Sequence, residues 1–367
     1  MKITALITVY RDPRDLKSII ERLLFFDYAE KEIIVVVDGP TNEAIESILD
    51  LYRNHIRIHY NGIQKGKVMS LNDVTRTLQT DALLFIDNDI IFPQDKYFLK
   101  KLAIYLENNH IVEMPKEARV NTFISAMMSY EFMGFVTATY LLAKLSGHSP
   151  SMNGACFAVQ KAWFDKLGGF RRVINEDMDF AARSFIHHGR FAFPPELKVT
   201  NGVSDTLKDW LIQRKRWALN NVLWFKWYFL DVLKKSLSFP ALLLAIGVFI
   251  LPIAAYVLAY ILLHVFRLKI LAALVMLVSH AWSFTSALLF NFIQYSFLAG
   301  GSYIPFLLAL GFTMGIYWGV AKHFHMRFVW WEFILFYLFY LPVWTLFNLV
   351  FFLLVIFDVK VQTQWKI

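Results

Sequence analysis

Residues 82–89 have the sequence Ala-Leu-Leu-Phe-Ile-Asp-Asn-Asp, an apolar run that ends in two carboxylates one residue apart. A short apolar run followed at once by polar residues is typical of a strand buried on both faces of a parallel sheet. In open α/β sheets, ligands bind beyond the carboxyl ends of the strands. The run therefore predicts a central strand over 82–86 that places Asp87 and Asp89 at a binding edge.

The sequence around this strand alternates β-branched runs with helical patterns. The expected strands are 3–9, 32–37, 56–60 and 82–86, and the expected helices are 13–26, 42–52 and 67–78. This alternation is typical of α/β units on a mostly parallel sheet. Two further polar clusters, residues 10–12 and 38–40, follow the first two strands, so we expect them at the same edge.

Charged residues are concentrated in the first part of the chain. Of the 367 residues, 57% are hydrophobic and 18% are charged, and only eight charged residues lie between Ser236 and Ile367. Because about 20 apolar residues cross a bilayer, this part is long enough for about four spans. The composition argues against a purely cytosolic protein. It predicts a soluble domain over residues 1–235 and a transmembrane domain over 236–367, with helices near 237–263, 270–298, 303–321 and 333–357.

The net charge of +8 is divided evenly between the two parts and shows no nucleic-acid footprint. Lys226, Lys234 and Lys235 precede the first apolar run, as expected for a segment against anionic cytoplasmic lipid. The single cysteine, Cys156, excludes an internal disulfide and agrees with a reducing compartment. We therefore expect an integral protein of the cell membrane whose first domain lies in the cytoplasm.

Two acidic motifs carry candidate chemistry, and each has a plainer interpretation. Asp87 and Asp89 can hold Mg²⁺ or Mn²⁺ together with a diphosphate, or they are solvated acids of a turn. Residues 175–177, Asn-Glu-Asp, can supply a general base, or they mark a helix N-terminus, where such residues are favoured. Neither motif alone distinguishes the catalytic interpretation from the plainer one.

A third motif, Gln-Arg-Lys-Arg-Trp at residues 213–217, lies upstream of the apolar part. It is compatible with an amphipathic interfacial helix whose basic side chains reach the lipid head groups. It is equally compatible with Arg216 binding phosphate, Gln213 donating a hydrogen bond and Trp217 stacking on a ligand.

Taken in order, these motifs resemble the family 2 glycosyltransferases, in particular the membrane-integrated branch of cellulose and hyaluronan synthases. The domain order is also similar to that of dolichol-phosphate mannose synthase. The resemblance spans residues 3–217 and implies a GT-A, Rossmann-like fold. It rests on Tyr10 after the first strand, Asp38, Gly-Lys-x-x-x-Leu-Asn at 66–72, Asp-x-Asp at 87–89, Gly-Gly-Phe at 168–170, Glu176-Asp177 and Gln-x-x-Arg-Trp at 213–217.

The resemblance also implies roles for individual residues. Asp87 and Asp89 would contact the nucleotide and a Mg²⁺ or Mn²⁺ ion. Glu176 and Asp177 would be catalytic, with Asp177 as the general base. The residues implied to bind the donor or close over it are Thr8, Tyr10, Asp38, Lys67, Gln213, Arg216 and Trp217.

The chain departs from the family pattern at three positions. Asp38 stands alone where many relatives have paired aspartates, which leaves the nucleotide base open. Asn175 replaces the usual threonine, and Asn220 lies where processive enzymes often have glycine. These two substitutions put little in doubt about catalysis.

The implied reaction is an inverting transfer of a hexose, with mannose or glucose favoured, from a GDP- or UDP-sugar. Processive synthases of this branch carry helices before as well as after the catalytic domain, and none precedes residue 3 here. We therefore expect one sugar to be added to a lipid-linked acceptor, a polyprenyl- or dolichyl-linked glycan or a glycolipid. The candidates for the border of the acceptor pocket are His148, or Asn153 and Gly154. The alternatives are a processive polysaccharide synthase, a dolichol-phosphate sugar synthase, and a non-enzymatic scaffold.

Overall fold

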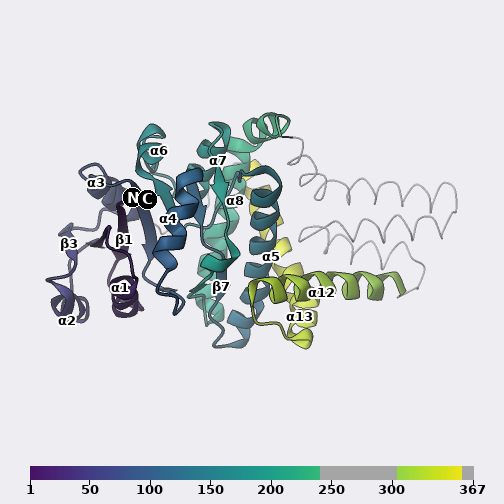
Figure 1. Ribbon diagram of the computed structural model, residues 1–367. Helices are drawn as coiled ribbons and strands as arrows, with labels where there is room; N and C mark the ends of the chain where they lie inside the picture. The colour runs from purple at the N-terminus through teal and green to yellow at the C-terminus, as the bar shows by residue number, and fades with distance from the viewer. Residues whose placement is uncertain (240–303, 358–367) are drawn as a thin grey trace.

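A computed structural model describes residues 1–239 and 304–357 of the chain, and its main feature is a seven-stranded mixed sheet (Figure 1). The strand order is β3-β2-β1-β4-β8-β6-β9. The first four strands in this order are parallel to one another, whereas β8 runs antiparallel to both β4 and β6. The expectation of a mostly parallel sheet is therefore correct for the first half of the domain, and the second half makes the sheet mixed.

The elements expected from the sequence are present with small shifts at their ends. They are β1 (Ile3–Val9), α1 (Leu16–Phe25), β2 (Lys31–Val37), α2 (Glu43–Tyr52), β3 (Arg57–Tyr60), α3 (Lys67–Thr75) and β4 (Ala82–Asp87). Asn42 caps α2 by accepting a hydrogen bond from the backbone N–H of Ile45. Helix α3 ends three residues before the predicted end.

The second half of the domain adds shorter strands and the helices that cover them. Its elements are β5 (Ile90–Ile91), α4 (Phe98–Asn108), β6 (Ile111–Glu113), β7 (Lys116–Ala118), α5 (Phe123–Ser146), β8 (Cys156–Gln160), α6 (Lys161–Lys166), α7 (Glu176–Ile186), β9 (Phe191–Ala192), the 3₁₀ turn η1 (Pro195–Leu197) and β10 (Val199–Asn201). Strands β5, β10 and β7 form a separate three-stranded sheet.

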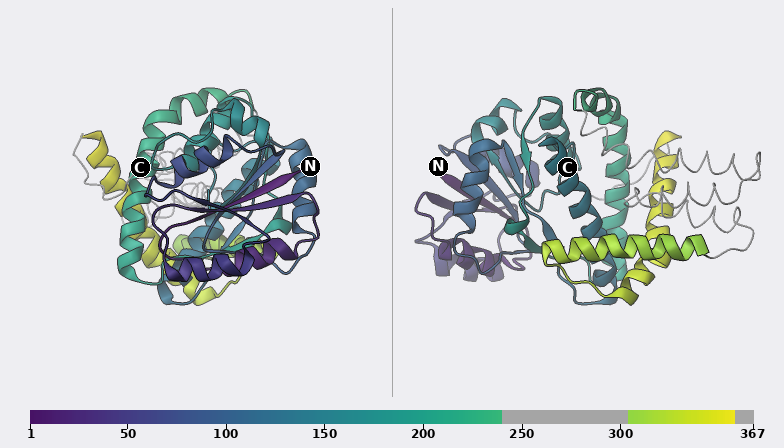
Figure 2. Two further views of the ribbon diagram at one scale, coloured as in Figure 1. Left: turned by 90° about the vertical axis from the view of Figure 1, so that its left-hand side faces the viewer. Right: turned by 45° about the vertical axis from the view of Figure 1, so that its right-hand side comes forward.

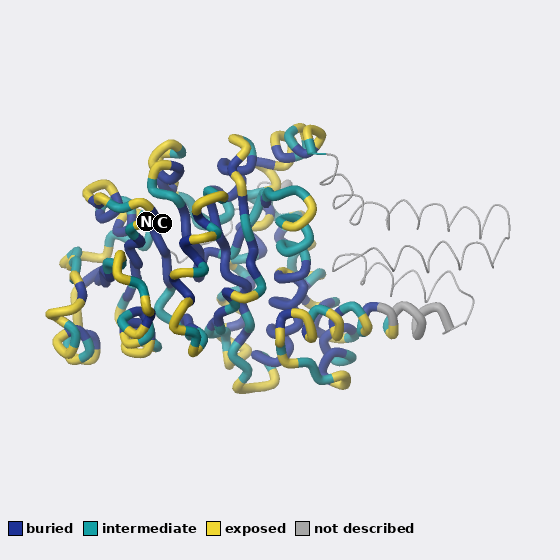
Figure 3. Tube along the Cα trace, in the orientation of Figure 1, coloured by how far each residue is buried: buried dark blue, intermediate teal, exposed yellow. Residues whose placement is uncertain are grey.

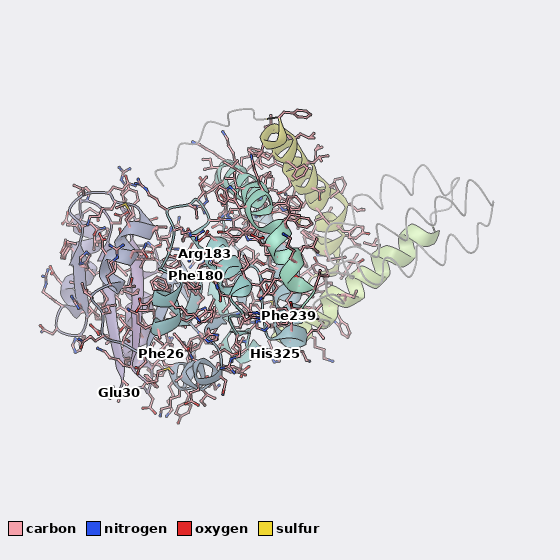
Figure 4. All side chains as sticks on the ribbon, turned by 90° about the horizontal axis from the view of Figure 1, so that it is seen from above. Phe26, Glu30, Phe180, Arg183, Phe239 and His325 are labelled. Atoms are coloured by element: carbon pink, nitrogen blue, oxygen red, sulfur yellow. The ribbon has the colours of Figure 1, made fainter. Side chains whose placement is uncertain are left out.

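The large sheet has an apolar core on each face, because successive residues of a strand point to opposite sides. Ile7 of β1 belongs to the core that includes Phe26, and the neighbouring Leu6 belongs to the core that includes Phe180. Phe26 and Phe180 are labelled in Figure 4. The tube in Figure 3 is mostly buried through the middle of this domain, and the two cores cover the sheet on both faces.

A third core joins the domain to its C-terminal helices (Figure 2). These helices are α8 (Leu207–Ser236), α12 (Ile304–Phe324), α13 (Trp330–Leu335), the π-helical turn η2 (Phe336–Tyr340) and α14 (Leu341–Ile356). They pack against α5, whose methionines are buried in this core. This part of α5, residues 125–133, therefore belongs to a core helix.

In the described part of the chain, Trp330–Val355 is the one helical run long and apolar enough to cross a membrane. Two of the expected spans, near 303–321 and 333–357, correspond to helices in the structure. The segments 237–263 and 270–298 lie almost wholly outside the described residues, and the boundary at Ser236 stays a prediction.

Candidate active site

Lys67, the first residue of α3, joins two acidic motifs. Its Nζ lies 2.6 Å from Oδ1 of Asp87 and 3.3 Å from Oε1 of Glu176. The starts of α3 and α7 and the end of β4 thus meet at one point. Burial opposes the charge on Lys67, but the carboxylates of Asp87 and Glu176 outweigh it and raise the pKa of the amine. The site therefore keeps a cation between two acids.

Thr8 and Tyr10 lie at the end of β1, beside these charges. Thr8 is in register with Asp87 on one side and with Val36 on the other. The ring of Tyr10 lies against Gly39, whose φ is +119°, and a Cβ on this glycine would be 3.3 Å from the ring. Glycine at position 39 therefore permits both the positive φ and the close approach.

Asp38 is buried, at 6% exposed, and its carboxylate holds the loop that precedes α3. Its carboxylate accepts hydrogen bonds from the backbone N–H groups of Lys65, at 2.8 Å, and Gly66, at 3.0 Å, and from the hydroxyl of Ser70, at 3.1 Å. These bonds fix the start of α3 and thereby the position of Lys67. The contact of Asp38 with a nucleotide stays a prediction.

Asp89 lies on the other side of Asp87 and is paired with an arginine. Its Oδ2 is 3.0 Å from Nη1 of Arg14, and Asn201 donates to its Oδ1 at 3.3 Å. Burial, together with the nearby Asp87 carboxylate, raises the pKa of Asp89 to about 6. A second cation next to this carboxylate would favour its ionised form.

The two carboxylates fit a hard divalent cation. Mg²⁺ is commonly held by one or two carboxylates, with substrate phosphates and water completing its shell. No group of three or more His, Cys, Asp or Glu side chains suited to a metal is found in residues 1–239 and 304–357. Within the described residues, Asp87 and Asp89 therefore do not form a closed structural metal site, and their role in holding an ion shared with a bound diphosphate stays a prediction.

Asp177 is held by two backbone N–H groups. That of Gly154 donates to Oδ2 at 2.7 Å and that of Met178 donates to Oδ1 at 2.7 Å. A Cβ added to Gly154 would be 2.6 Å from the Cβ of Asp177, so only glycine permits this approach. Burial raises the pKa of both Glu176 and Asp177, and the positive charge of Lys67 opposes this rise.

The Gly-Lys-x-x-x-Leu-Asn motif and the Gly-Gly-Phe motif contact each other and have a structural role. Asn72 donates to the carbonyl of Phe170 at 2.8 Å and accepts from the N–H of the same residue at 3.1 Å. A Cβ on Gly169 would lie 2.8 Å from Oδ1 of Asn72. The asparagine of the Gly-Lys motif therefore positions the Gly-Gly-Phe turn and contacts no carboxylate of the site.

The Gln-x-x-Arg-Trp motif lies on α8. Arg216 is exposed and has no hydrogen-bond or ion-pair partner among the described residues. Trp217 packs near Phe132 and Phe135 of α5. Within the described ranges, no hydrogen bond or ion pair joins Gln213, Arg216 or Trp217 to the carboxylates, so the donor-closing role of these three residues stays a prediction.

The two unusual asparagines are in contact. Nδ2 of Asn220, on α8, donates to Oδ1 of Asn175 at 2.5 Å, and Asn175 immediately precedes Glu176 and Asp177. This bond connects α8 to the start of α7. The two departures from the family pattern therefore form one contact beside the acidic motif.

Sequence reasoning missed Arg14 and Arg214. Arg14 follows the polar cluster 10–12 by two residues, and this proximity is the feature of the sequence that could have indicated a place in the site. Arg214 is fully buried, and its Nη1 is 2.6 Å from Oε1 of Glu131. Arg214 lies in the run Arg-Lys-Arg, and nothing in this sequence indicates which of the three basic side chains enters the core.

Comparisons with known proteins agree with this arrangement. The family model described as "Glycosyltransferase like family 2" matches residues 2–220. Poly-beta-1,6-N-acetyl-D-glucosamine synthase of Staphylococcus epidermidis strain RP62A is 20% identical over 220 residues, which are 59% of this chain and 53% of that protein. The corresponding synthase of Staphylococcus aureus strain COL is 22% identical with the same coverage. The chain thus spans about half the length of these curated relatives.

Among solved structures, the mannosyltransferase PcManGT from Pyrobaculum calidifontis, in complex with GDP-Man and Mn²⁺, is similar in fold. Its TM-score is 0.55 at 17% sequence identity, with 98% of this chain and 88% of that chain covered. The α/β fold, the order of the motifs and the match over 2–220 lead to one conclusion. The chain belongs to the glycosyltransferase-like family 2 and carries a GT-A glycosyltransferase domain.

Proposed function

We propose that this protein is an inverting, metal-dependent hexosyltransferase that moves one sugar from a nucleotide sugar to a lipid-linked acceptor. The observation that carries the proposal is the joining of Asp87 and Glu176 through Lys67, with Asp177 next in the chain. This arrangement supports the proposal because it brings a cation and three carboxylates to one edge of the sheet, where a diphosphate and an acceptor hydroxyl could bind.

In the proposed reaction, Asp177 takes the proton of the acceptor hydroxyl while the hydroxyl oxygen attacks the anomeric carbon. The bond from that carbon to the diphosphate breaks, and the configuration inverts. Lys67 and Arg216 pair with the diphosphate oxygens as negative charge develops on them. Asp87 and Asp89 would hold a Mg²⁺ or Mn²⁺ ion, which supplies further positive charge at the leaving group.

The proposed donor is a GDP- or UDP-hexose, with mannose or glucose favoured. A likeness of fold to a protein solved with GDP-Man and Mn²⁺ supports the use of this class of donor. Arg216 is exposed and has no ion-pair partner among the described residues, and the pair of Lys67 and Asp87 is partly exposed. Both therefore leave charged groups available to a diphosphate.

The lipid-linked acceptor is supported by the packing of the C-terminal helices. The apolar run Trp330–Val355 includes all but the last residue of α14, which packs along α8, and α8 carries the Gln-x-x-Arg-Trp motif. Nε1 of Trp210 donates to the hydroxyl of Tyr340 at 2.9 Å, which links α8 to this run. A membrane helix fixed to the catalytic domain would hold the site at the cytoplasmic face of the cell membrane, within reach of an acceptor head group.

The second candidate function is a processive polysaccharide synthase. It is favoured by the curated relatives, which are poly-beta-1,6-N-acetyl-D-glucosamine synthases. The two candidates differ in their products. The first adds a single sugar to each acceptor, and the second makes polysaccharide chains of many lengths.

The test begins with the thermal stability of detergent-purified protein across nucleotides and nucleotide sugars with Mn²⁺, since a ligand that binds the native state raises its melting temperature. The donor identified in this way is then incubated, radiolabelled, with membrane lipid extract. We expect one labelled sugar per lipid acceptor. Long polymer as the sole product would favour the synthase, and the absence of stabilisation and transfer with every donor would refute both candidates.

A further inference from the structure

Glu113 and Lys116 form a buried ion pair behind the candidate site. Each residue is 3% exposed, and Nζ of Lys116 lies 2.9 Å from Oε1 of Glu113. Glu113 ends β6 and Lys116 begins β7, so both lie outside the motifs that the sequence points to. A buried ion pair is often no more stabilising than apolar side chains of the same size, so stability alone does not account for it.

The same carboxylate oxygen contacts the segment 153–155, which precedes β8. Oε1 of Glu113 accepts from the backbone N–H of Asn153 at 3.2 Å. The segment is also held on its other side, where the carbonyl of Ala155 accepts from the N–H of Asp87 at 2.8 Å. It therefore lies between the ends of β4 and β6.

The middle residue of this segment contacts the candidate base. The N–H of Gly154 donates to Oδ2 of Asp177 at 2.7 Å, and a Cβ on Gly154 would be 2.6 Å from the Cβ of Asp177. With so little free space, a shift of the segment would displace the carboxylate of Asp177. An unbroken series of contacts thus runs from Glu113 through Asn153 and Gly154 to Asp177.

We propose that Glu113 is a positioning residue: by holding the backbone of Asn153, it fixes Gly154 and so sets the orientation of the Asp177 carboxylate toward the acceptor hydroxyl. Lys116 keeps the Glu113 carboxylate in place and also donates to the carbonyl of Met114 at 3.0 Å. This inference rests on the proposed role of Asp177 as the general base. It predicts that the hydrogen-bond acceptor at position 113, and not its charge, supports the reaction.

Two double variants separate the effect of the hydrogen-bond acceptor at position 113 from the effect of its charge. Glu113→Gln with Lys116→Met removes the ion pair but keeps an oxygen for the N–H of Asn153. Glu113→Leu with Lys116→Met removes the ion pair and the acceptor. A displacement of about 1 Å in a catalytic group costs up to about 100-fold in rate, so we expect kcat of the leucine variant to fall by about 10- to 100-fold. The glutamine variant is expected to stay within about threefold of the wild type, since its acceptor is retained.

The donor KM is expected to stay within about twofold in both variants, because the contact acts on Asp177 and not on the diphosphate site. Equal kcat values in the two double variants, or a loss confined to the donor KM, would overturn the proposal. Gly154→Ala is a third variant that leaves the ion pair intact. It is expected to lower kcat with the donor KM unchanged, since its Cβ would displace Asp177, and an unchanged kcat would also count against the proposal.

Hydrogen exchange tests the contact without relying on activity. The amides of residues 153–155 are expected to exchange faster in the leucine variant than in the glutamine variant, while those of β1 exchange equally in both. If the wild type transfers no sugar, the proposed function fails, and the exchange result still decides whether Glu113 holds this segment. Equal exchange at 153–155 in the two variants would refute the positioning role.

Discussion

The edge of the sheet and the layer formed by α5, α8 and α14 both contain carboxylate–cation pairs, but they differ in accessibility. At the sheet edge, the side chains of Lys67 and Asp87 are about one third exposed, at 33% and 34%. In the helical layer, the side chains of Arg214 and Glu131 are 0% and 6% exposed. A pair open to solvent can exchange its partner for a ligand, whereas the sealed pair of Arg214 and Glu131 is closed to ligands and links helices. The sheet edge is thus suited to chemistry and the helical layer to support.

The largest predicted effect tests the sheet edge. Asp177→Asn keeps the size of the side chain but cannot accept the proton of the acceptor hydroxyl, so we expect transfer to fall by at least about 100-fold. Donor binding, measured by thermal stabilisation with the nucleotide sugar and Mn²⁺, should be nearly unchanged. The matched control is Asp50→Asn on the exposed side of α2, which should change neither quantity. Loss of donor binding in Asp177→Asn would instead assign this residue to the metal site.

The sheet edge is also the part that the sequence predicts well. Strand β1 and the start of β4 have the predicted bounds, because their apolar runs are bordered by turn residues. Since parallel strands end at the same edge, placing Thr8 and Asp87 together required only the strand positions. The approach of Glu176 to Lys67 depended on the family resemblance, because these residues are more than 100 positions apart.

The helical layer could not be predicted in the same way. Local periodicity does not tell which of three neighbouring basic residues enters a core, and Arg214 does so because Glu131 from α5 is there to receive it. The antiparallel course of β8 likewise depends on pairing with β4 and β6, which are distant in sequence. Contacts of this kind are set by tertiary packing, which overrides local preference.

The second prediction tests whether the helical layer is support. Arg214→Met leaves the Glu131 carboxylate buried with the hydroxyl of Tyr340 as its remaining partner, so we expect a loss of about 3–5 kcal/mol in the free energy of unfolding. The double variant Arg214→Met with Glu131→Leu removes both charges and should recover most of this loss. Denaturant unfolding in detergent measures both. Equal destabilisation in the single and double variants would show that the pair itself is not what holds the layer together.

The third prediction concerns the Gln-x-x-Arg-Trp motif, which lies on α8 in the helical layer and is proposed to act at the sheet edge. Arg216 is exposed on α8, next in the chain to the partly buried Trp217, and we propose that it pairs with the diphosphate. Because hydrogen bonds to charged groups contribute about 1.5–3 kcal/mol, Arg216→Ala should lower kcat/KM by about 10- to 100-fold. The free energy of unfolding should change by less than about 0.5 kcal/mol. Lys208→Ala, an exposed cation at the start of the same helix, is the control and should change neither, whereas an equal loss in both variants would indicate a general effect of surface charge.

The smallest predicted effects come from removing the N-terminal cap of α2 or that of α8. Asn42 caps α2 through the N–H of Ile45, and Thr206 caps α8 through the N–H of Asp209 at 3.1 Å. Removing either cap by substitution with alanine should cost about 1 kcal/mol, measured by denaturant unfolding. The two variants should differ in transfer, because α2 carries no residue of the candidate site and α8 carries Arg216. Thr206→Ala should therefore lower the rate while Asn42→Ala leaves it unchanged; the same rate in both would mean that the position of Arg216 is set by the packing of α8 along its length, and not by how the helix begins.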